Sequence, residues 1–132
     1  MSVEHSYKKF FYVALPCEAK PLIAYYKLKK DLRINAFSVF GLGDICLIVT
    51  GLGKTAMAAA IAYTQAVFVS EYPLLINVGV AGHKEEKIGK LYLVSKIVDK
   101  DSERCFYPPL VIKTALPSAT VFTKACLLYT SP

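Results

Sequence analysis

Three long apolar runs, each ending at a glycine or a proline, constrain the fold of this chain more than any other feature. They occupy residues 10–15 (FFYVAL), 44–51 (DICLIVTG) and 74–82 (LLINVGVAG). Runs of this kind are typical of strands that are buried on both faces of a sheet. Helical patterns follow the first two runs. The sequence therefore predicts an α/β fold class, with a mixed, twisted sheet flanked by helices.

The two predicted helices differ in character. Residues 17–30 (CEAKPLIAYYKLKK) form an amphipathic pattern with lysines at its end, and the start is expected near Glu18 or Ala19 because Pro21 fits only a first turn. Residues 54–70 are rich in alanine and apolar almost all round, which predicts a buried helix. Residues 34–41 and 44–51 are expected to form a hairpin, residues 90–99 a further strand, and the pattern becomes irregular from Lys100.

Length, hydropathy and charge limit the function classes. The chain has 132 residues, which is one domain by length, and a mean hydropathy of +0.41. Its longest uncharged stretch, residues 55–70, is shorter than the roughly 20 residues of a membrane span, so no membrane association is expected. The net charge is +6, but no basic stripe is interleaved with aromatic residues, which argues against a nucleic-acid partner.

Cysteine usage and the N-terminus indicate a cytoplasmic protein. Three of the four cysteines lie among apolar or strand-like residues, as free, buried thiols of a reducing compartment do. The first ten residues contain no hydrophobic signal region.

Strand-to-helix turns are where sheets of this class bind ligands. Residues 15–18 and 50–54 form two such turns, and the glycine turn after Asn77 is a third candidate. The motif GLGKT at residues 51–55 is too short for a phosphate-binding P-loop, because Ile48 stands where that motif needs its first glycine. GLGKTA fits a loose dinucleotide fingerprint, but the following strand lacks the acidic residue that would bind a ribose. Tight turning and close helix packing are the simpler reasons for these glycines.

Glu18 is the main candidate for chemistry. A carboxylate early in a helix ordinarily interacts with the helix dipole. Glu18 also follows a buried strand directly, where it could orient or deprotonate a water molecule, and both interpretations stay open. Metal binding is not expected: His5 and His83 are isolated, His83 is interpreted as a surface-loop residue, and the acidic group at residues 99–103 as a solvated loop.

Four segments in register resemble one superfamily over roughly residues 10 to 110. They read VALPCEAKPLI, VTGLGKTAMAAAIA, LLINVGVAG and IGKLYLVSKIVDKD. The resemblance is to the N-terminal half of the purine nucleoside phosphorylase and methylthioadenosine/S-adenosylhomocysteine nucleosidase superfamily, the family-1 phosphorylases. It implies a three-layer αβα fold, a nucleoside as the small-molecule substrate, and no metal or organic cofactor.

The resemblance also implies roles for particular residues. Glu18 matches the glutamate that activates water in the nucleosidases, where many phosphorolytic members have a phosphate-binding arginine. Hydrolysis is therefore favoured over phosphorolysis, and a non-catalytic nucleotide-binding module, which would bind NAD, is a further alternative. The resemblance places Leu15 and Leu52, which are apolar, near the ribose. It places the turn of Gly79, Val80, Ala81 and Gly82 beside the purine. Phe106 matches an aromatic residue that contributes to the pocket of the neighbouring subunit in a homodimer. Val80 stands where the family has serine, which puts the identity of the substrate in doubt.

The superfamily has a second half that this sequence does not match. That half supplies a ribose-binding glutamate and the aspartate that protonates the purine. We therefore expect residues 1–125 to be the N-terminal part of such a domain, inactive alone. Residues 126–132 (CLLYTSP) match a translated sequencing adaptor and are not expected to be native.

Overall fold

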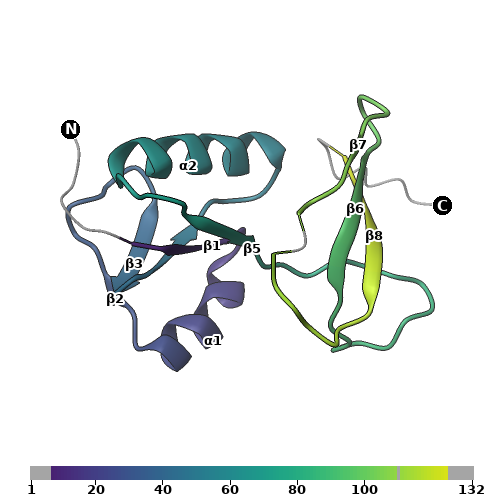
Figure 1. The fold of residues 1–132 in the computed structure, drawn as a ribbon, viewed down its shortest axis with the longest axis horizontal. Helices are drawn as coiled ribbons and strands as arrows, with labels where there is room; N and C mark the ends of the chain where they lie inside the picture. The colour runs from purple at the N-terminus through teal and green to yellow at the C-terminus, as the bar shows by residue number, and fades with distance from the viewer. Residues whose placement is uncertain (1–6, 110, 125–132) are drawn as a thin grey trace. The chain divides into compact units, whose positions relative to one another are not determined.

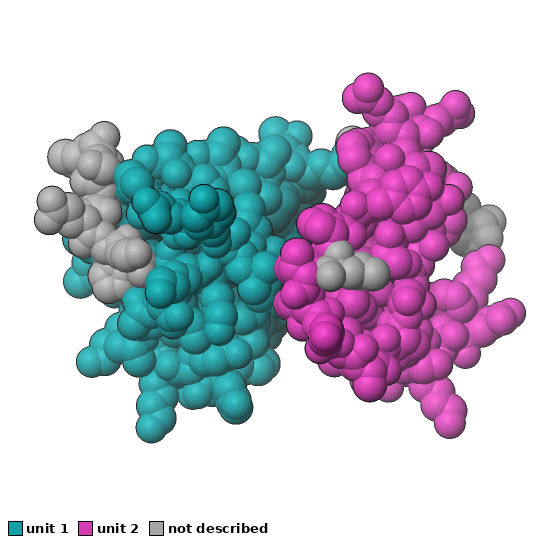
Figure 2. Space-filling view, viewed as in Figure 1, with its two compact units in different colours: residues 1–80 teal, residues 81–132 magenta. Residues whose placement is uncertain are grey.

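The computed structural model describes residues 7–109 and 111–124, and the chain divides into two compact units, residues 1–80 and 81–132. Figure 2 colours the two units separately. The predicted adaptor translation, residues 126–132, lies outside the described residues, and so does His5.

Unit 1 (residues 1–80) is built on a five-stranded mixed sheet. Its strand order is β2-β3-β4-β1-β5, with β1 parallel to both β4 and β5, and β3 antiparallel to β4 and β2. The elements in chain order are β1 (Lys9–Val13), α1 (Pro16–Tyr26), β2 (Lys29–Lys30), β3 (Ser38–Leu42), β4 (Ile45–Val49), α2 (Lys54–Val67) and β5 (Leu74–Asn77).

The two helices cover opposite faces of this sheet (Figure 1). Side chains of a strand alternate between faces, and those of β1 divide accordingly. Phe10 and Tyr12 pack with Ala60 of α2, whereas Phe11 and Val13 pack with Ala19 of α1. The predicted fold class, a mixed sheet between helical layers, is confirmed.

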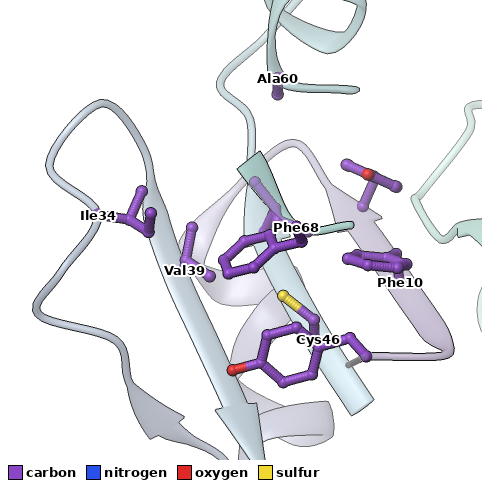
Figure 3. Close-up of a cluster of buried hydrophobic side chains, with 9 residues drawn as sticks. Phe10, Ile34, Val39, Cys46, Ala60 and Phe68 are labelled. Carbon is purple, nitrogen blue, oxygen red and sulfur yellow. The ribbon is translucent and has the colours of Figure 1, made fainter. Parts of the chain in front are cut away.

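The cluster beneath α2 is the better buried of the two. Figure 3 shows Phe10, Val39, Cys46 and Phe68 meeting between the sheet and the helix, and each of these four side chains is fully buried. The Tyr12 hydroxyl enters this layer and is hydrogen-bonded: it lies 2.7 Å from Thr64 Oγ1 and accepts a hydrogen bond from Gln65 Nε2 at 2.9 Å. Strand β1 is thereby joined to α2 by hydrogen bonds as well as by packing.

Unit 2 (residues 81–132) contains a three-stranded sheet in the order β7-β6-β8. Strand β6 is parallel to β8 and antiparallel to β7. The bounds are β6 (Leu93–Asp99), β7 (Cys105–Phe106) and β8 (Ser118–Thr123). Among the residues described here in unit 2, none is buried.

The first helix departs from its predicted bounds at both ends. It begins at Pro16 rather than near Glu18 or Ala19, because proline is well suited to the first helical position, and Pro21 lies inside the helix. It ends at Tyr26, because Lys27 adopts the left-handed conformation with φ of 56°. Residues 29–30 then pair with β3 as a strand, so the expected lysine-rich helix end is wrong.

The second helix is less buried than predicted. Helix α2 ends at Val67, and only Ala60 and Thr64 are fully buried in it, while several of its alanines are exposed. Alanine is small enough to be tolerated on either face, so an alanine-rich pattern cannot locate the buried side. In the described part of the chain, neither helix is long and apolar enough to cross a membrane.

Three further expectations need correction. Residues 34–37 form no strand, so β3 is shorter than predicted. Strand β8 lies in the segment that was expected to be irregular. The cysteines that the structure describes are free, but only Cys46 is buried, while Cys17 and Cys105 are exposed; Cys126 lies outside the described residues.

Candidate functional site

The three loops that the sequence singled out lie at one edge of the unit 1 sheet. Strands β1, β4 and β5 are mutually parallel, so their carboxyl ends point the same way. The loops that follow are joined by backbone hydrogen bonds: Thr50 N–H donates to Val13 O at 2.8 Å, and Gly51 N–H donates to Ala14 O at 3.1 Å. The Val78 N–H donates to Tyr12 O at 3.1 Å and holds the third loop against β1.

Glu18 connects two of these loops through its carboxylate. It is the third residue of α1 and is half-buried. Its Oε1 accepts a hydrogen bond from the Leu15 N–H at 2.9 Å, and its Oε2 accepts one from the Val80 N–H at 3.0 Å. The first contact is the helix-capping contact expected of an early carboxylate, and the second reaches 62 residues along the chain to the loop after β5.

This arrangement fixes the carboxylate without saturating it. A carboxylate offers about four acceptor positions, and two are used by the main-chain donors. The remaining lone pairs can accept a hydrogen bond from a water molecule. A carboxylate held in one orientation can therefore position that water and take a proton from it.

Apolar side chains surround this edge on each of the three loops. Leu15, Leu52 and Val80 have exposed fractions of 37%, 65% and 89%. Gly79 approaches the carboxylate closely, since a Cβ built there would lie 3.4 Å from Glu18 Oε2. These four residues belong to unit 1 and to the loops after β1, β4 and β5, and Glu18 lies in the first turn of α1 beside them, as the sequence predicted. Their roles toward a ligand stay predictions.

The glycines of the β4–α2 loop serve the turn itself. Gly51 and Gly53 have φ of 90° and 98°, which residues with a Cβ rarely adopt. Gly53 is the residue that precedes α2. Their observed role is the tight turning that the sequence indicated.

The remaining predicted substrate positions, Ala81, Gly82 and Phe106, lie in unit 2 and are exposed. Phe106 is in β7 and half of its surface is accessible. His83 lies in an exposed loop, as expected, and its Nδ1 accepts hydrogen bonds from the Glu85 and Glu86 N–H groups, both at 3.0 Å. Across residues 7–109 and 111–124, no group of three or more His, Cys, Asp or Glu side chains is placed to hold a metal ion.

Sequence reasoning missed the two main-chain donors to Glu18. A backbone N–H has no residue signature, so neither donor can be identified from its own residue type. The capping pattern around Glu18 could have predicted the first donor. The second depends on where the chain turns after β5, which only the structure shows.

Comparisons with known proteins locate the fold. No protein-family model matches the sequence, and no curated protein matches it significantly. Solved structures do match. A 5′-methylthioadenosine/S-adenosylhomocysteine nucleosidase from Helicobacter pylori, solved with butyl-thio-DADMe-Immucillin-A, gives a TM-score of 0.73 at 13% identity, over 93% of this chain and 66% of that one.

Two further structures agree. A futalosine hydrolase mutant from Helicobacter pylori gives a TM-score of 0.70 at 12% identity, over 94% of this chain and 70% of that one. The corresponding nucleosidase from Neisseria meningitidis, in complex with methylthio-immucillin-A, gives 0.68 at 17% identity, over 94% and 68%.

The chain therefore has the fold of the nucleoside phosphorylase and hydrolase superfamily, and the resemblance found in the sequence is confirmed at the level of the fold. It spans about two thirds of the length of these nucleosidases.

Proposed function

We propose that the protein containing this chain hydrolyses the N-glycosidic bond of a purine nucleoside, and that Glu18 positions and deprotonates the attacking water. The placement of the Glu18 carboxylate carries this proposal. It lies at the carboxyl edge of the sheet, with one oxygen on the Leu15 N–H and the other on the Val80 N–H. The nucleosidase fold of the chain supports it.

The proposed reaction passes through an oxocarbenium-like transition state. The water oxygen bonds to the anomeric carbon of the ribose as the bond from that carbon to the purine nitrogen breaks. The purine leaves with the bonding electron pair and takes up a proton, and Glu18 receives a proton from the water. The negative charge of Glu18 also favours the positive charge that develops on the sugar.

Hydrolysis fits this site better than phosphorolysis does. A phosphate nucleophile is anionic and would be repelled by the Glu18 carboxylate, whereas water is neutral and gives up a proton to it. The exposed aliphatic side chains of Leu15, Leu52 and Val80 offer no charge to bind phosphate. We propose accordingly that Leu15 and Leu52 lie near the ribose and that residues 79–82 line the base.

The proposal also covers the oligomeric state and the location of the whole protein. We propose a homodimer, in which the half-exposed Phe106 of one subunit contributes to the pocket of the other. We also propose a cytoplasmic location, which suits the free thiols of Cys17, Cys46 and Cys105.

Glu18→Gln tests the proposal. The protein containing this chain is incubated with 5′-methylthioadenosine, S-adenosylhomocysteine, futalosine and inosine, and the free base is measured by chromatography. We expect the substitution to lower kcat by about 10²–10⁴-fold, the usual contribution of a general base, while substrate binding measured by calorimetry persists. Glu71→Gln, which changes an exposed carboxylate outside the three loops, should leave kcat unchanged.

Other outcomes distinguish the alternatives. Unchanged kcat in Glu18→Gln would remove this residue from the reaction. Base release that depends on added phosphate would show phosphorolysis. Tight NAD binding without release of any base would favour the nucleotide-binding module.

A further inference from the structure

Gly79, in the loop after β5, is a glycine that left-handed backbone does not explain. Its φ lies outside the range from +20° to +160°, whereas Gly51 and Gly53 both lie within that range. An alanine at residue 79 would therefore be free of the strain that a left-handed conformation imposes on a residue with a Cβ. The reason for a glycine at this position lies in its surroundings.

The surroundings of Gly79 point to the Glu18 carboxylate. Among the described residues, and apart from its chain neighbours, the only heavy atom within 4 Å of a Cβ built at Gly79 is Glu18 Oε2, at 3.4 Å. That distance is an ordinary van der Waals contact, so the loop has room for a methyl group. A side chain at residue 79 would thus disturb the fold little, and it would act mainly on this one oxygen.

Glu18 Oε2 keeps an acceptor position beside Gly79. A carboxylate oxygen offers about two lone pairs, and the Val80 N–H, at 3.0 Å, uses one of them. Gly79 and Val80 are both exposed, so solvent reaches this side of the carboxylate. A water molecule that donates to Oε2 lies about 2.5–3.0 Å from it. Non-bonded heavy atoms need about 3.5–4.0 Å between them, so a methyl group on residue 79 would crowd that water.

We propose that Gly79 is a positioning residue: because it has no side chain, it admits the attacking water to Oε2 of Glu18. This inference rests on the proposed hydrolysis and deepens it. It is separate from the contact with the base proposed for residues 79–82, because it concerns the nucleophile. It also gives the two carboxylate oxygens different tasks, since Oε1 fastens the carboxylate to the start of α1 and Oε2 binds the water.

Gly79→Ala tests the inference in the protein containing this chain. The substrate is the best cleaved of the four nucleosides used to test the proposed function. We expect kcat to fall by about 10²-fold, because the water is displaced from its productive position. We expect KM to stay within about twofold, because the water takes part in the chemical step and not in substrate binding. Ser38→Thr adds one methyl group at an exposed position of β3, outside the three loops, and should change neither constant.

The pH profile gives a readout that a structural role for Gly79 would not change. A methyl group in place of water leaves the carboxylate less solvated, which disfavours its charged form. We therefore expect the acidic limb of the kcat/KM profile to move to higher pH in Gly79→Ala. Ser38→Thr should keep the profile of the unaltered protein.

A double-mutant cycle shows whether Gly79 acts through Glu18. In the Glu18→Gln background the general base is already lost, so adding Gly79→Ala should lower kcat by less than about twofold further. A full second loss would show that residue 79 acts independently of the carboxylate, and it would overturn the inference.

The remaining outcomes separate this inference from the proposed function. If Glu18→Gln loses activity while Gly79→Ala keeps its kcat, the inference alone is overturned. A rise in KM without a fall in kcat would show that residue 79 meets only the base or a sugar hydroxyl. Loss of the folded circular dichroism spectrum in Gly79→Ala would show that the glycine serves the backbone. Unchanged kcat in Glu18→Gln would overturn both proposals.

Discussion

Unit 1 and unit 2 both begin from strands rich in apolar residues, but only unit 1 converts them into a core. Its buried side chains lie between Tyr7 and Phe68 and form one cluster on each face of the sheet. In unit 2, the described residues include no buried side chain, although β6 carries the aliphatic residues Leu93, Val94, Ile97 and Val98. The difference lies in the helices, because a sheet cannot exclude water from its own faces.

The difference in burial makes the two units contribute unequally to the free energy of unfolding. Burying an aliphatic or aromatic side chain contributes about 1.5–3 kcal/mol, so the clusters of unit 1 supply the stability of the chain. The exposed rings of unit 2 contribute little until something covers them. We therefore expect unit 1 to govern the unfolding of the 132-residue chain.

The largest predicted effect comes from removing a core ring. Phe10→Ala in unit 1 should lower the free energy of unfolding by about 3–5 kcal/mol, because it leaves a cavity in a fully buried cluster. Phe122→Ala in unit 2 should cost below about 1 kcal/mol in the same 132-residue chain, because that ring is exposed. Urea unfolding followed by circular dichroism measures both, and equal losses would refute the contrast between the units.

The second largest effect is a loss of stability of unit 1 at alkaline pH. Burial is the main reason that the pKa of Cys46 rises from 9.0 to about 12 and that of Tyr7 from 10.0 to about 12. Below the pKa values of the unfolded chain, both side chains are neutral in the folded and the unfolded state. At such pH the free energy of unfolding keeps its full value. As pH rises toward 12, the unfolded chain ionises first and the folded state loses about 1.4 kcal/mol per pH unit for each group.

Cys46→Ala isolates one of these groups. In the unaltered chain the loss should begin near pH 9, and in the variant it should begin near pH 10, where only Tyr7 still contributes. Urea midpoints measured between pH 8 and 11 would show the shift. An identical pH profile in both proteins would mean that Cys46 is accessible to solvent.

A tight contact in unit 1 gives the third effect. At Gly41, an added Cβ would lie 2.6 Å from Cζ of the buried Tyr7 ring, so Gly41→Ala should destabilise the chain by about 1–3 kcal/mol through overpacking. Gly82→Ala in unit 2 meets nothing within 4 Å and should be nearly neutral. Thermal unfolding of the two variants, compared side by side, tests whether unit 1 is packed more tightly around Gly41 than unit 2 is around Gly82.

The smallest effect concerns the polar contact in the unit 1 core. Thr64→Val removes the hydroxyl that bonds to Tyr12 and should cost about 1 kcal/mol, because Gln65 still donates to the tyrosine. Thr55→Val changes an exposed threonine of the same helix and serves as the control. A difference between them below about 0.3 kcal/mol would show that this hydrogen bond is replaced by water.

The sequence was most informative where strands are buried on both faces. The runs that became β1 and β4 fit this description, whereas the run that became β5 contains the polar Asn77 and forms a strand with Leu75 exposed. The order of the three runs relative to the helical patterns predicted the fold class and the three loops. Glu18 could be singled out for the same reason, since its position follows directly from the end of β1. Its contact with Val80 could not, because it joins residues from opposite ends of unit 1 through a main-chain group.

In other segments, tertiary contacts determined the secondary structure against the local sequence pattern. Lys29 and Lys30 continue a helical pattern but pair with β3, since the left-handed Lys27 has already turned the chain. Strand β8 alternates exposed and half-buried residues between Pro117 and the end of the described residues, and the neighbouring prolines hid that short signal. The exposed surface of α2 was missed because alanine carries too little hydrophobic area to mark a face.

The edges of the two sheets also differ in their tendency to associate. Unit 1 has one edge formed by β2, which is only two residues long and consists of lysines, an arrangement that discourages pairing with another chain. In unit 2, β8 is an edge strand of six residues without a charged side chain. A concentrated preparation would therefore be expected to aggregate by strand addition at β8, and a lysine introduced at an exposed position such as Thr120 would be the first remedy.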